Sequence, residues 1–270
     1  MIRSLLDHTD HELVVDVIDA DDHVVRRVGT GDVTPLPDAW RGHLAGRSPH
    51  THARIVAPAL SDFRGRSLFL EADQLVLDDL TDLADFDLGG APMAAVHRSD
   101  ARGADWDGLS GDVFAPGVIL FDNERCRGLE PVATAVRSAS DPEFYEDAVV
   151  LGPRWREFTG LDVARLEPRY NDLERCRDDT VVLHFTHWAR QPWRFAGHPE
   201  SDRWMETFLD AVSHGDVTAA ELDTGAESDL VSRRVRTVAK LPRRVAPLVD
   251  RALQWRHGAG GSTFSRTPGR

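Results

Sequence analysis

Short apolar runs recur along the chain and alternate with stretches of helical periodicity. The strongest runs are Leu68–Leu70, Met93–Val96, Gly117–Phe121 and Val181–Phe185, whose length and mostly apolar composition predict buried strands. A further run at Leu13–Ile18 ends in an Asp-rich turn and also predicts a strand. Since strands and helical segments alternate, the pattern predicts an α/β protein with a mixed sheet.

Helical periodicity is clearest near the end of this alternation. Asp202–Val212 places five apolar residues on one face, namely Trp204, Met205, Phe208, Leu209 and Val212. The pattern also predicts helical turns within Thr51–Leu60 and Asn123–Val136, and the end of a short helix at Met1–His8.

Two carboxylates follow the run at Leu68–Leu70 directly, as Glu71 and Asp73. Ligands of α/β sheets bind outside the carboxyl ends of strands, and residues two apart in an extended chain face the same side. The pair could therefore hold one Mg²⁺ or Mn²⁺ with substrate phosphates. The alternative is an ordinary helix N-cap cluster, because three more acids follow at Asp78, Asp79 and Asp82.

The composition fits one large intracellular domain. The 270 residues are 41% hydrophobic, enough for a full core. Cys126 and Cys176 lie fifty positions apart without metal-ligand spacing, which indicates a reducing cytosol. The N-terminus carries charge and no window approaches eighteen apolar residues, so we expect a cytoplasmic protein with neither an export signal nor a membrane span.

Charge is distributed unevenly. The chain carries −13, yet residues 229–270 hold ten basic and two acidic side chains, a net of +8, which leaves −21 for residues 1–228. Such an acidic surface stays soluble where salt screens its self-repulsion, so we expect a salt-rich cytoplasm. The acidity also argues against nucleic-acid binding by the main body.

We therefore divide the chain into a domain at 1–228 and a basic tail at 229–270. Apolar residues in the tail step by three and four with arginines between them, although Pro242 and Pro247 interrupt the stripe. Over 230–256 this basic amphipathic segment could lie on an anionic membrane surface. Packing against the acidic body is the alternative, and the composition of His257–Arg270 predicts disorder.

Several segments, taken in order, resemble the family-8 type of GT-A glycosyltransferases over roughly Ser4–Val212. SLFLEADQLVLDDLTDL resembles the central strand of that family with its Asp-x-Asp metal motif, and LHFTHWARQPW resembles its terminal HxTG...KPW motif. The resemblance implies that Glu71, Asp73 and His184 bind the metal. FAPGVILFDNERC, LEPRYNDL and HPESDRW are similar to further family segments.

The resemblance implies a GT-A-like, Rossmann-related mixed central sheet flanked by helices. It also implies retaining, Mn²⁺- or Mg²⁺-dependent transfer of a sugar from a nucleotide sugar, most plausibly UDP-linked, to a hydroxyl of a glycan, glycolipid or polysaccharide. The implied donor-binding residues are Arg54, Ala72, Gly117, Asn171, Arg190 and Trp193. Surface ion pairing is the alternative for Arg190 and core packing for Trp193. No residue is assigned as general base.

The chain also departs from the family pattern. Glu71 replaces the first Asp, Ala115 the Asn that contacts the sugar, His187 the motif Gly, and Arg190 or Gln191 the Lys. The matching segments begin at Ser4, so the first strand of the family is missing from them. These departures motivate an alternative function, a degenerate, non-catalytic module that binds a glycan or a partner protein. A third hypothesis is a phosphate-ester hydrolase that uses the same carboxylates.

Overall fold

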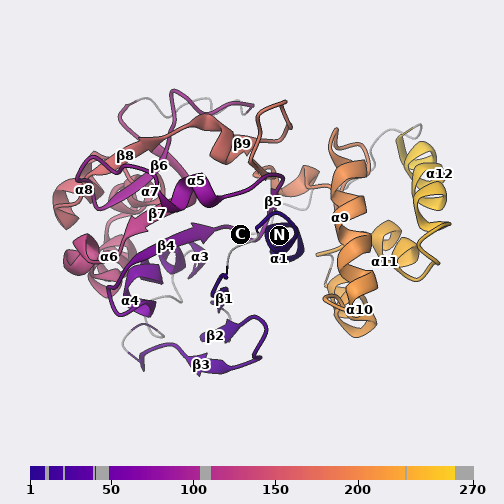
Figure 1. Ribbon diagram of the computed structural model, residues 1–270, viewed down its shortest axis with the longest axis horizontal. Coiled ribbons are helices and arrows are strands. Elements are labelled where there is room, and N and C mark those ends of the chain that lie inside the picture. The colour runs from indigo at the N-terminus through magenta and orange to yellow at the C-terminus, as the bar shows by residue number, and fades with distance from the viewer. Residues whose placement is uncertain are drawn as a thin grey trace.

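The protein is described from a computed structural model that covers residues 1–9, 12–20, 22–38, 40, 49–103, 111–228 and 230–258. Within these ranges the strands form three sheets, with helices on both sides (Figure 1). The α/β class with helix-flanked sheets is confirmed.

A four-stranded sheet carries the main core. Its strands lie in the order β4 (Arg66–Leu70), β7 (Phe114–Asp122), β6 (Met93–His97) and β8 (Val163–Leu166). β7 runs antiparallel to both of its neighbours, whereas β6 and β8 are parallel, so the sheet is mixed as predicted. β4, β6 and β7 contain three of the four strongest apolar runs.

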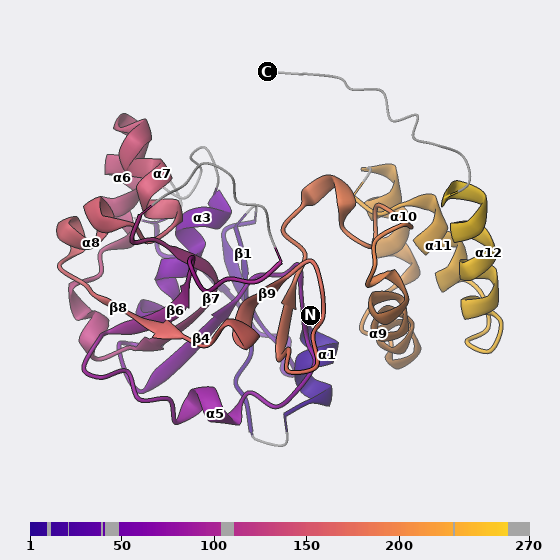
Figure 2. The ribbon, with the colours of Figure 1, turned by 90° about the horizontal axis from the view of Figure 1, so that it is seen from above.

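Both faces of this sheet are covered, because successive side chains of each strand enter different clusters. Val118 and Leu120 of β7 pack with Val182 from a second sheet. Ile119 and Phe121 pack with aromatic residues of α7 (Pro142–Val149) and α8 (Pro153–Thr159). Helices α6 (Pro131–Ser140), α7 and α8 gather on this side of the sheet (Figure 2).

β4 differs from the expectation of a central strand buried on both faces. It is an edge strand of the four-stranded sheet, paired only with β7 among the strands that the structure describes. Its five residues are accordingly exposed or half-buried, whereas the first eight of the nine residues of β7 are buried. Leu68 and Leu70 still pack against one core cluster and Phe69 against the other. An apolar run alone cannot distinguish an edge strand from a central one.

The remaining strands form two smaller sheets. β5 (Gln74–Val76), β10 (Val182–His184) and β9 (Asp172–Leu173) form one, in which β10 is antiparallel to β5 and parallel to β9. The antiparallel strands β1 (Asp16–Asp19), β2 (Val24–Arg27) and β3 (Val33–Pro35) form the other. The short helices are α1 (Ile2–Asp7), α3 (Pro49–Ala53), η1 (Arg54–Val56), α4 (Ala57–Leu60), α5 (Thr81–Ala84), η2 (Arg125–Gly128), η3 (Pro168–Asn171) and η4 (Trp188–Arg190).

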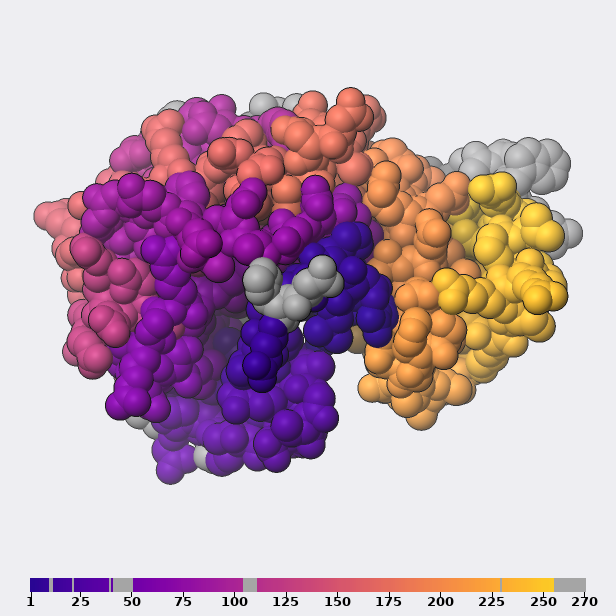
Figure 3. Space-filling model, viewed as in Figure 1, coloured from indigo at the N-terminus to yellow at the C-terminus, as the bar shows by residue number. Residues whose placement is uncertain are grey.

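Helices α9 (Ser201–His214), α10 (Ala219–Glu227), α11 (Arg233–Ala239) and α12 (Ala246–Gly258) form a separate layer beside the sheets (Figures 1 and 2). α1 contacts both α9 and β5, and Figure 3 shows this indigo helix between the two parts. None of the helices in the described ranges is long and apolar enough to cross a membrane.

The tail beyond residue 229 packs on α9. Val235, Val238 and Ala246 are buried in one cluster with Met205 and Leu209 of α9. The guanidinium of Arg234 and the carboxylate of Asp250 form a buried ion pair at 3.0 Å. Part of the predicted stripe therefore faces the protein, while Val245 and Leu248 are exposed.

The boundary at residue 228 stays a prediction. The disorder expected for 257–270 falls, from residue 259 onward, outside the described ranges.

Candidate metal and donor site

Glu71 and Asp73 lie in the turn between β4 and β5, and His184 ends β10. Gln74 of β5 is opposite His184, so strand pairing brings both carboxylates to the imidazole. His184 Nε2 lies 3.0 Å from a Glu71 oxygen and 3.2 Å from an Asp73 oxygen. One ligand atom of each residue lies within 4.8 Å of the other two. Two oxygens and one nitrogen so placed suit one Mn²⁺ or Mg²⁺ ion.

Asn171 sets the orientation of the His184 ring. Its Nδ2 donates to the carbonyl of Ala115 at 2.9 Å, so its Oδ1 is the atom that faces His184 Nδ1 at 3.0 Å. Nδ1 must then carry a proton, which leaves Nε2 to face the carboxylates. Both Asn171 and His184 are buried. This is the tautomer that a metal-binding imidazole requires.

The two carboxylates also affect the pKa of His184. Burial alone would lower the pKa of His184, but hydrogen bonds to Asp73 and Glu71, together with their negative charge, raise that pKa to about 9. The raised pKa reflects the two carboxylates that face Nε2 when no other cation lies between them. A divalent ion bound there would displace a proton on Nε2.

A cavity of about 180 Å³ opens beside these three residues. Arg54 lines it, with Nη2 donating to Glu71 at 2.8 Å and Nη1 to the carbonyl of Val149 at 3.1 Å. Gly117 lines it where a Cβ would lie 2.4 Å from Cε1 of His184, so a side chain is excluded there. The remaining lining residues are Glu71, Asp73, Ala115, Pro116, Val149, Val150, Asn171, Leu173, His184 and Thr186.

Three residues from the predicted donor set lie elsewhere. Arg190 and Ala72 are exposed and do not line the cavity. Trp193 packs edge-on against Phe185, 5.8 Å between ring centroids, and against Trp204 of α9. These contacts are those of core packing, the alternative that the sequence left open, and its part in donor binding stays a prediction.

The downstream acids serve a different purpose from Glu71 and Asp73. The backbone N–H and hydroxyl of Thr81 both donate to Asp79, at 3.0 and 2.7 Å, where α5 begins. Asp79 therefore acts at the start of a helix. Glu71 and Asp73, in contrast, converge on His184.

Gln191 is the site residue that sequence reasoning did not select. It is 5% exposed, and its Nε2 donates to Asp73 Oδ2 at 3.0 Å and to the carbonyl of Phe185 at 2.9 Å. The resemblance left Arg190 and Gln191 open as replacements for the family Lys, and only the folded segment shows that Gln191 points inward. It places a neutral amide beside Asp73.

The profile of "Glycosyl transferase family 8" matches residues 43–197, more than half of the chain. The chain belongs to glycosyl transferase family 8. Membership makes the protein a glycosyltransferase with a GT-A fold, as the resemblance implied. A comparison with curated proteins found no match.

Solved structures resemble this family-8 chain at low sequence identity. The bifunctional glycosyltransferase WbbM matches 77% of the chain and 46% of its own, with 17% identity and a TM-score of 0.50, which shows a shared fold. The galactosyltransferase LgtC, solved with donor and acceptor sugar analogs, matches 64% of this chain and 72% of its own at 22% identity and a TM-score of 0.46. GlyE of Streptococcus pneumoniae TIGR4 matches 57% and 42% at 22% identity, with a TM-score of 0.43. The chain spans less than half of WbbM and of GlyE.

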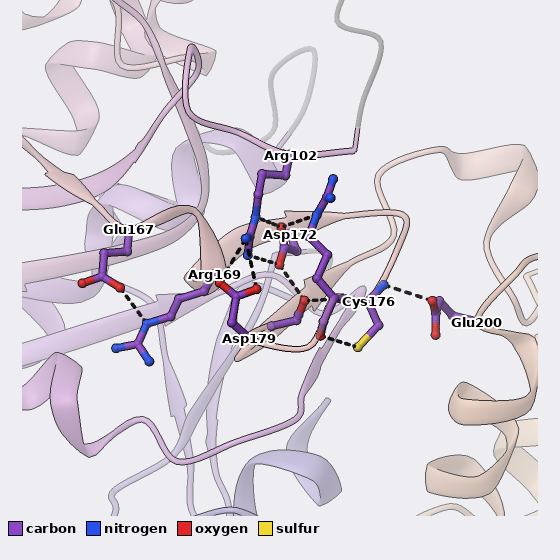
Figure 4. A network of polar contacts seen from close by, with 9 residues as sticks. Arg102, Glu167, Arg169, Asp172, Cys176, Asp179 and Glu200 are labelled. Carbon is purple, nitrogen blue, oxygen red and sulfur yellow. Dashed lines mark hydrogen bonds and ion pairs between the residues drawn. The ribbon is translucent and has the colours of Figure 1, made fainter.

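In the family-8 chain, a polar network centred on the buried Asp172 anchors the segment that carries Asn171 (Figure 4). The carboxylate of Asp172, which has no exposed surface, accepts from Arg102 Nε at 2.6 Å and from Thr180 Oγ1 at 2.6 Å. Arg102 also donates to Asp179 at 3.0 Å. Asp172 follows Asn171 directly in the chain, so this network fixes the position from which Asn171 reaches His184.

A second network surrounds Glu174, just after β9. Its carboxylate accepts from Thr186 Oγ1 and from the backbone N–H of His187, both at 2.7 Å, and from His198 Nε2 at 3.1 Å. Burial alone would raise the pKa of Glu174, but hydrogen bonds from His198, Thr186 and the His187 N–H lower it to about 2.

Glu174 is expected to make stability depend on pH. Because its folded pKa is about 2 against an ordinary 4.5, its contribution is complete above pH 4.5 and disappears as pH falls toward 2. We expect Glu174→Gln to unfold more easily than wild type by about 2 kcal/mol at pH 7, since the side chain is mostly buried. Urea unfolding of both proteins from pH 7 to pH 3.5 measures the gap, which is the difference between their free energies of unfolding. A gap that stays constant below pH 4.5 would contradict the assignment.

Proposed function

We propose that the protein transfers a sugar from a UDP-linked nucleotide sugar to a hydroxyl acceptor in a metal-dependent reaction that retains the anomeric configuration. The observation that carries the proposal is the convergence of Glu71, Asp73 and His184 Nε2 beside a cavity in a family-8 chain. The acceptor class implied is a glycan, glycolipid or polysaccharide, and the proposed setting is a salt-rich cytoplasm.

Each residue has a distinct part in this proposal. Glu71, Asp73 and His184 hold Mn²⁺ or Mg²⁺, which supplies positive charge to the diphosphate and to the departing nucleotide. Arg54 adds a fixed positive charge at the cavity wall, held in place by Glu71 and the Val149 carbonyl. Gly117 leaves room beside the imidazole, and Asn171 holds its tautomer.

A non-catalytic binding module is not favoured. Such a module has no need for two carboxylates and a buried imidazole held in the metal-binding tautomer, and that apparatus is costly to retain because buried charges require partners. Phosphate-ester hydrolysis is separable by experiment, because it releases phosphate from simple esters whereas sugar transfer does not.

Nucleotide binding is expected to raise thermal stability only with metal present. In high potassium chloride, UDP or a UDP-sugar at a hundred times its dissociation constant should add about 2.7 kcal/mol with Mn²⁺. Thermal denaturation with a panel of nucleotides and nucleotide sugars, each with and without Mn²⁺, measures this and identifies the donor class.

Two results of these denaturation experiments decide whether the proposal stands. Stabilisation that needs Mn²⁺ and disappears in Asp73→Ala supports the site. Failure of every nucleotide to stabilise the wild-type protein would overturn the proposed donor.

We further propose peripheral contact with an anionic membrane through 230–256. Support comes from the corner between α11 and α12, where Arg243, Arg244, Val245, Leu248 and Arg251 are all exposed. Basic side chains near an anionic surface contribute about 1 kcal/mol each.

The membrane proposal predicts a loss of vesicle binding in one variant. Arg244→Glu combined with Leu248→Glu should lower flotation with vesicles that contain phosphatidylserine about tenfold at fixed salt. Val33→Glu is the matched control, because Val33 is exposed on the distant strand β3. Equal flotation of all three proteins would refute the contact.

A further inference from the structure

Glu174 lies outside the cluster of metal ligands, yet it contacts both ends of the segment that follows His184 and carries Gln191. Its backbone N–H donates to the carbonyl of His184 at 2.9 Å, and its carboxylate accepts from Thr186 and His187 immediately after the strand. The same carboxylate accepts from His198, at the far end of the segment. Residues 185–198 are thus fastened at their start and their end by one side chain.

The backbone of Glu174 supports a constrained role. Its φ is +64°, a left-handed value that costs a non-glycine residue energy and persists only where surrounding contacts hold it. The bond from its N–H to the His184 carbonyl is one such contact, and it joins Glu174 directly to a proposed metal ligand.

A neutral His198 ring can form the hydrogen bond to Glu174. Its Nδ1 accepts from the backbone N–H of Glu200 at 3.1 Å, so in the neutral ring the proton resides on Nε2 and is donated to Glu174. His198 is 6% exposed. The ring is therefore fixed from both sides, and Glu174 provides the acceptor that Nε2–H requires.

The segment held in this way carries Gln191. Its buried amide donates to Asp73 Oδ2 and to the Phe185 carbonyl, and Thr186 of the same segment lines the cavity. Gln191 thereby occupies one carboxylate oxygen of Asp73, while the other faces His184 Nε2 at 3.2 Å. The orientation of Asp73 depends on where this segment lies.

We propose that Glu174 is a positioning residue, which fastens residues 185–198 to β10 and so holds the Gln191 amide against Asp73. It acts on cation binding through Gln191, and that part of the inference rests on the proposed function. Outer partners of metal ligands typically change metal affinity ten- to a hundredfold when replaced.

Glu174→Gln tests the role at constant size. Its amide group offers one oxygen and one NH₂, so it cannot accept from Thr186, His187 and His198 together; one donor must face another donor. Adding His198→Gln restores a match, because a glutamine amide can present its oxygen where His198 presented Nε2–H. Glu221→Gln is the matched control, because Glu221 accepts two bonds from Thr218 at the start of α10, away from the cavity.

The first measurement is hydrogen exchange by mass spectrometry on the full chain without added metal. Glu174→Gln should speed exchange of peptides from 185–198 about tenfold more than it speeds exchange of β7, whose amides respond only to the global loss of stability. Glu221→Gln should change neither region, and the double variant with His198→Gln should recover protection of 185–198. Unchanged exchange over 185–198, or an equal rise throughout the chain, would overturn the proposal.

The second measurement is titration with MnCl₂ by calorimetry. Glu174→Gln and Gln191→Leu should each weaken Mn²⁺ binding about tenfold, and the two together no more than either alone, because both act through one contact. Additive losses would show that Glu174 does not act through Gln191. If the wild-type protein binds no Mn²⁺, the metal part of the proposed function fails, and the exchange result still decides the positioning role.

Discussion

Replacement of Asp73 by alanine is expected to lower the rate of Mn²⁺-dependent donor hydrolysis and sugar transfer about a thousandfold. A bound cation typically supplies several kcal/mol of charge stabilisation in the transition state, and a loss of about 4 kcal/mol corresponds to that factor. Asp73 provides one of only two carboxylates in the cluster, and Gln191 already occupies its second oxygen. His184→Ala should have a comparable effect. The measurement is release of nucleotide from the donor identified by thermal denaturation, at saturating Mn²⁺.

Asp78→Ala is the matched control for charge. Asp78 lies five residues downstream, is exposed, and its carboxylate accepts only from the N–H of Asp79 among the contacts that the structure describes. It should retain full activity. If Asp73→Ala kept its Mn²⁺-dependent turnover, the cluster would not be the catalytic metal site, whatever its shape. A matched fall in both variants would indicate a general effect of surface charge.

The sequence predicts part of this site, because each ligand lies next to an apolar run that marks a strand. Glu71 and Asp73 follow an apolar run, and His184 ends another, so the periodicity of the strands places each at a strand end before any pairing is known. What the periodicity cannot provide is the pairing of β5 with β10, since β5 has only three residues, the first of them polar. The resemblance to the family supplied that association.

The fold was predictable in class and less so in layout. The four strong apolar runs became β4, β6, β7 and β10, but the run with three large apolar residues in β4 lies at a sheet edge, while β7 occupies the interior. β8 went unpredicted because its sequence, Val-Ala-Arg-Leu, is short and interrupted by Arg165. Edge position depends on which strands pair, which a single strand does not encode.

The choice between Arg190 and Gln191 was open for the same reason. The two residues are adjacent, so motif spacing alone could not choose between them, and charge favoured the arginine. In the structure the 3₁₀ turn η4 ends at Arg190 and leaves it exposed, and the next residue turns inward. Selecting Gln191 required the path of residues 185–198, which is set by Glu174 and His198 and not by local propensity.

Gly117→Ala is expected to disable the site from outside its ligand set. A Cβ at Gly117 would lie 2.4 Å from His184 Cε1, 2.5 Å from its Nδ1 and 2.9 Å from Gln74 Nε2. Neither neighbour can move away easily, because His184 is bound to Asn171 and Gln74 donates to the Gly117 carbonyl in a buried setting. We expect the free energy of unfolding to fall by about 3 kcal/mol, as in other overpacked cores. Mn²⁺ affinity should fall at least tenfold as the imidazole rotates away.

Urea unfolding and calorimetric titration with MnCl₂ measure the two effects separately, with Gly128→Ala as the control. A Cβ at Gly128 would meet no atom within 4 Å, and the φ of Gly128 is not left-handed, so its substitution should change neither quantity by a measurable amount. Loss of Mn²⁺ binding with stability intact would still place the methyl group against His184. Wild-type stability together with wild-type affinity would mean that β7 does not approach the imidazole closely enough to exclude a side chain at residue 117.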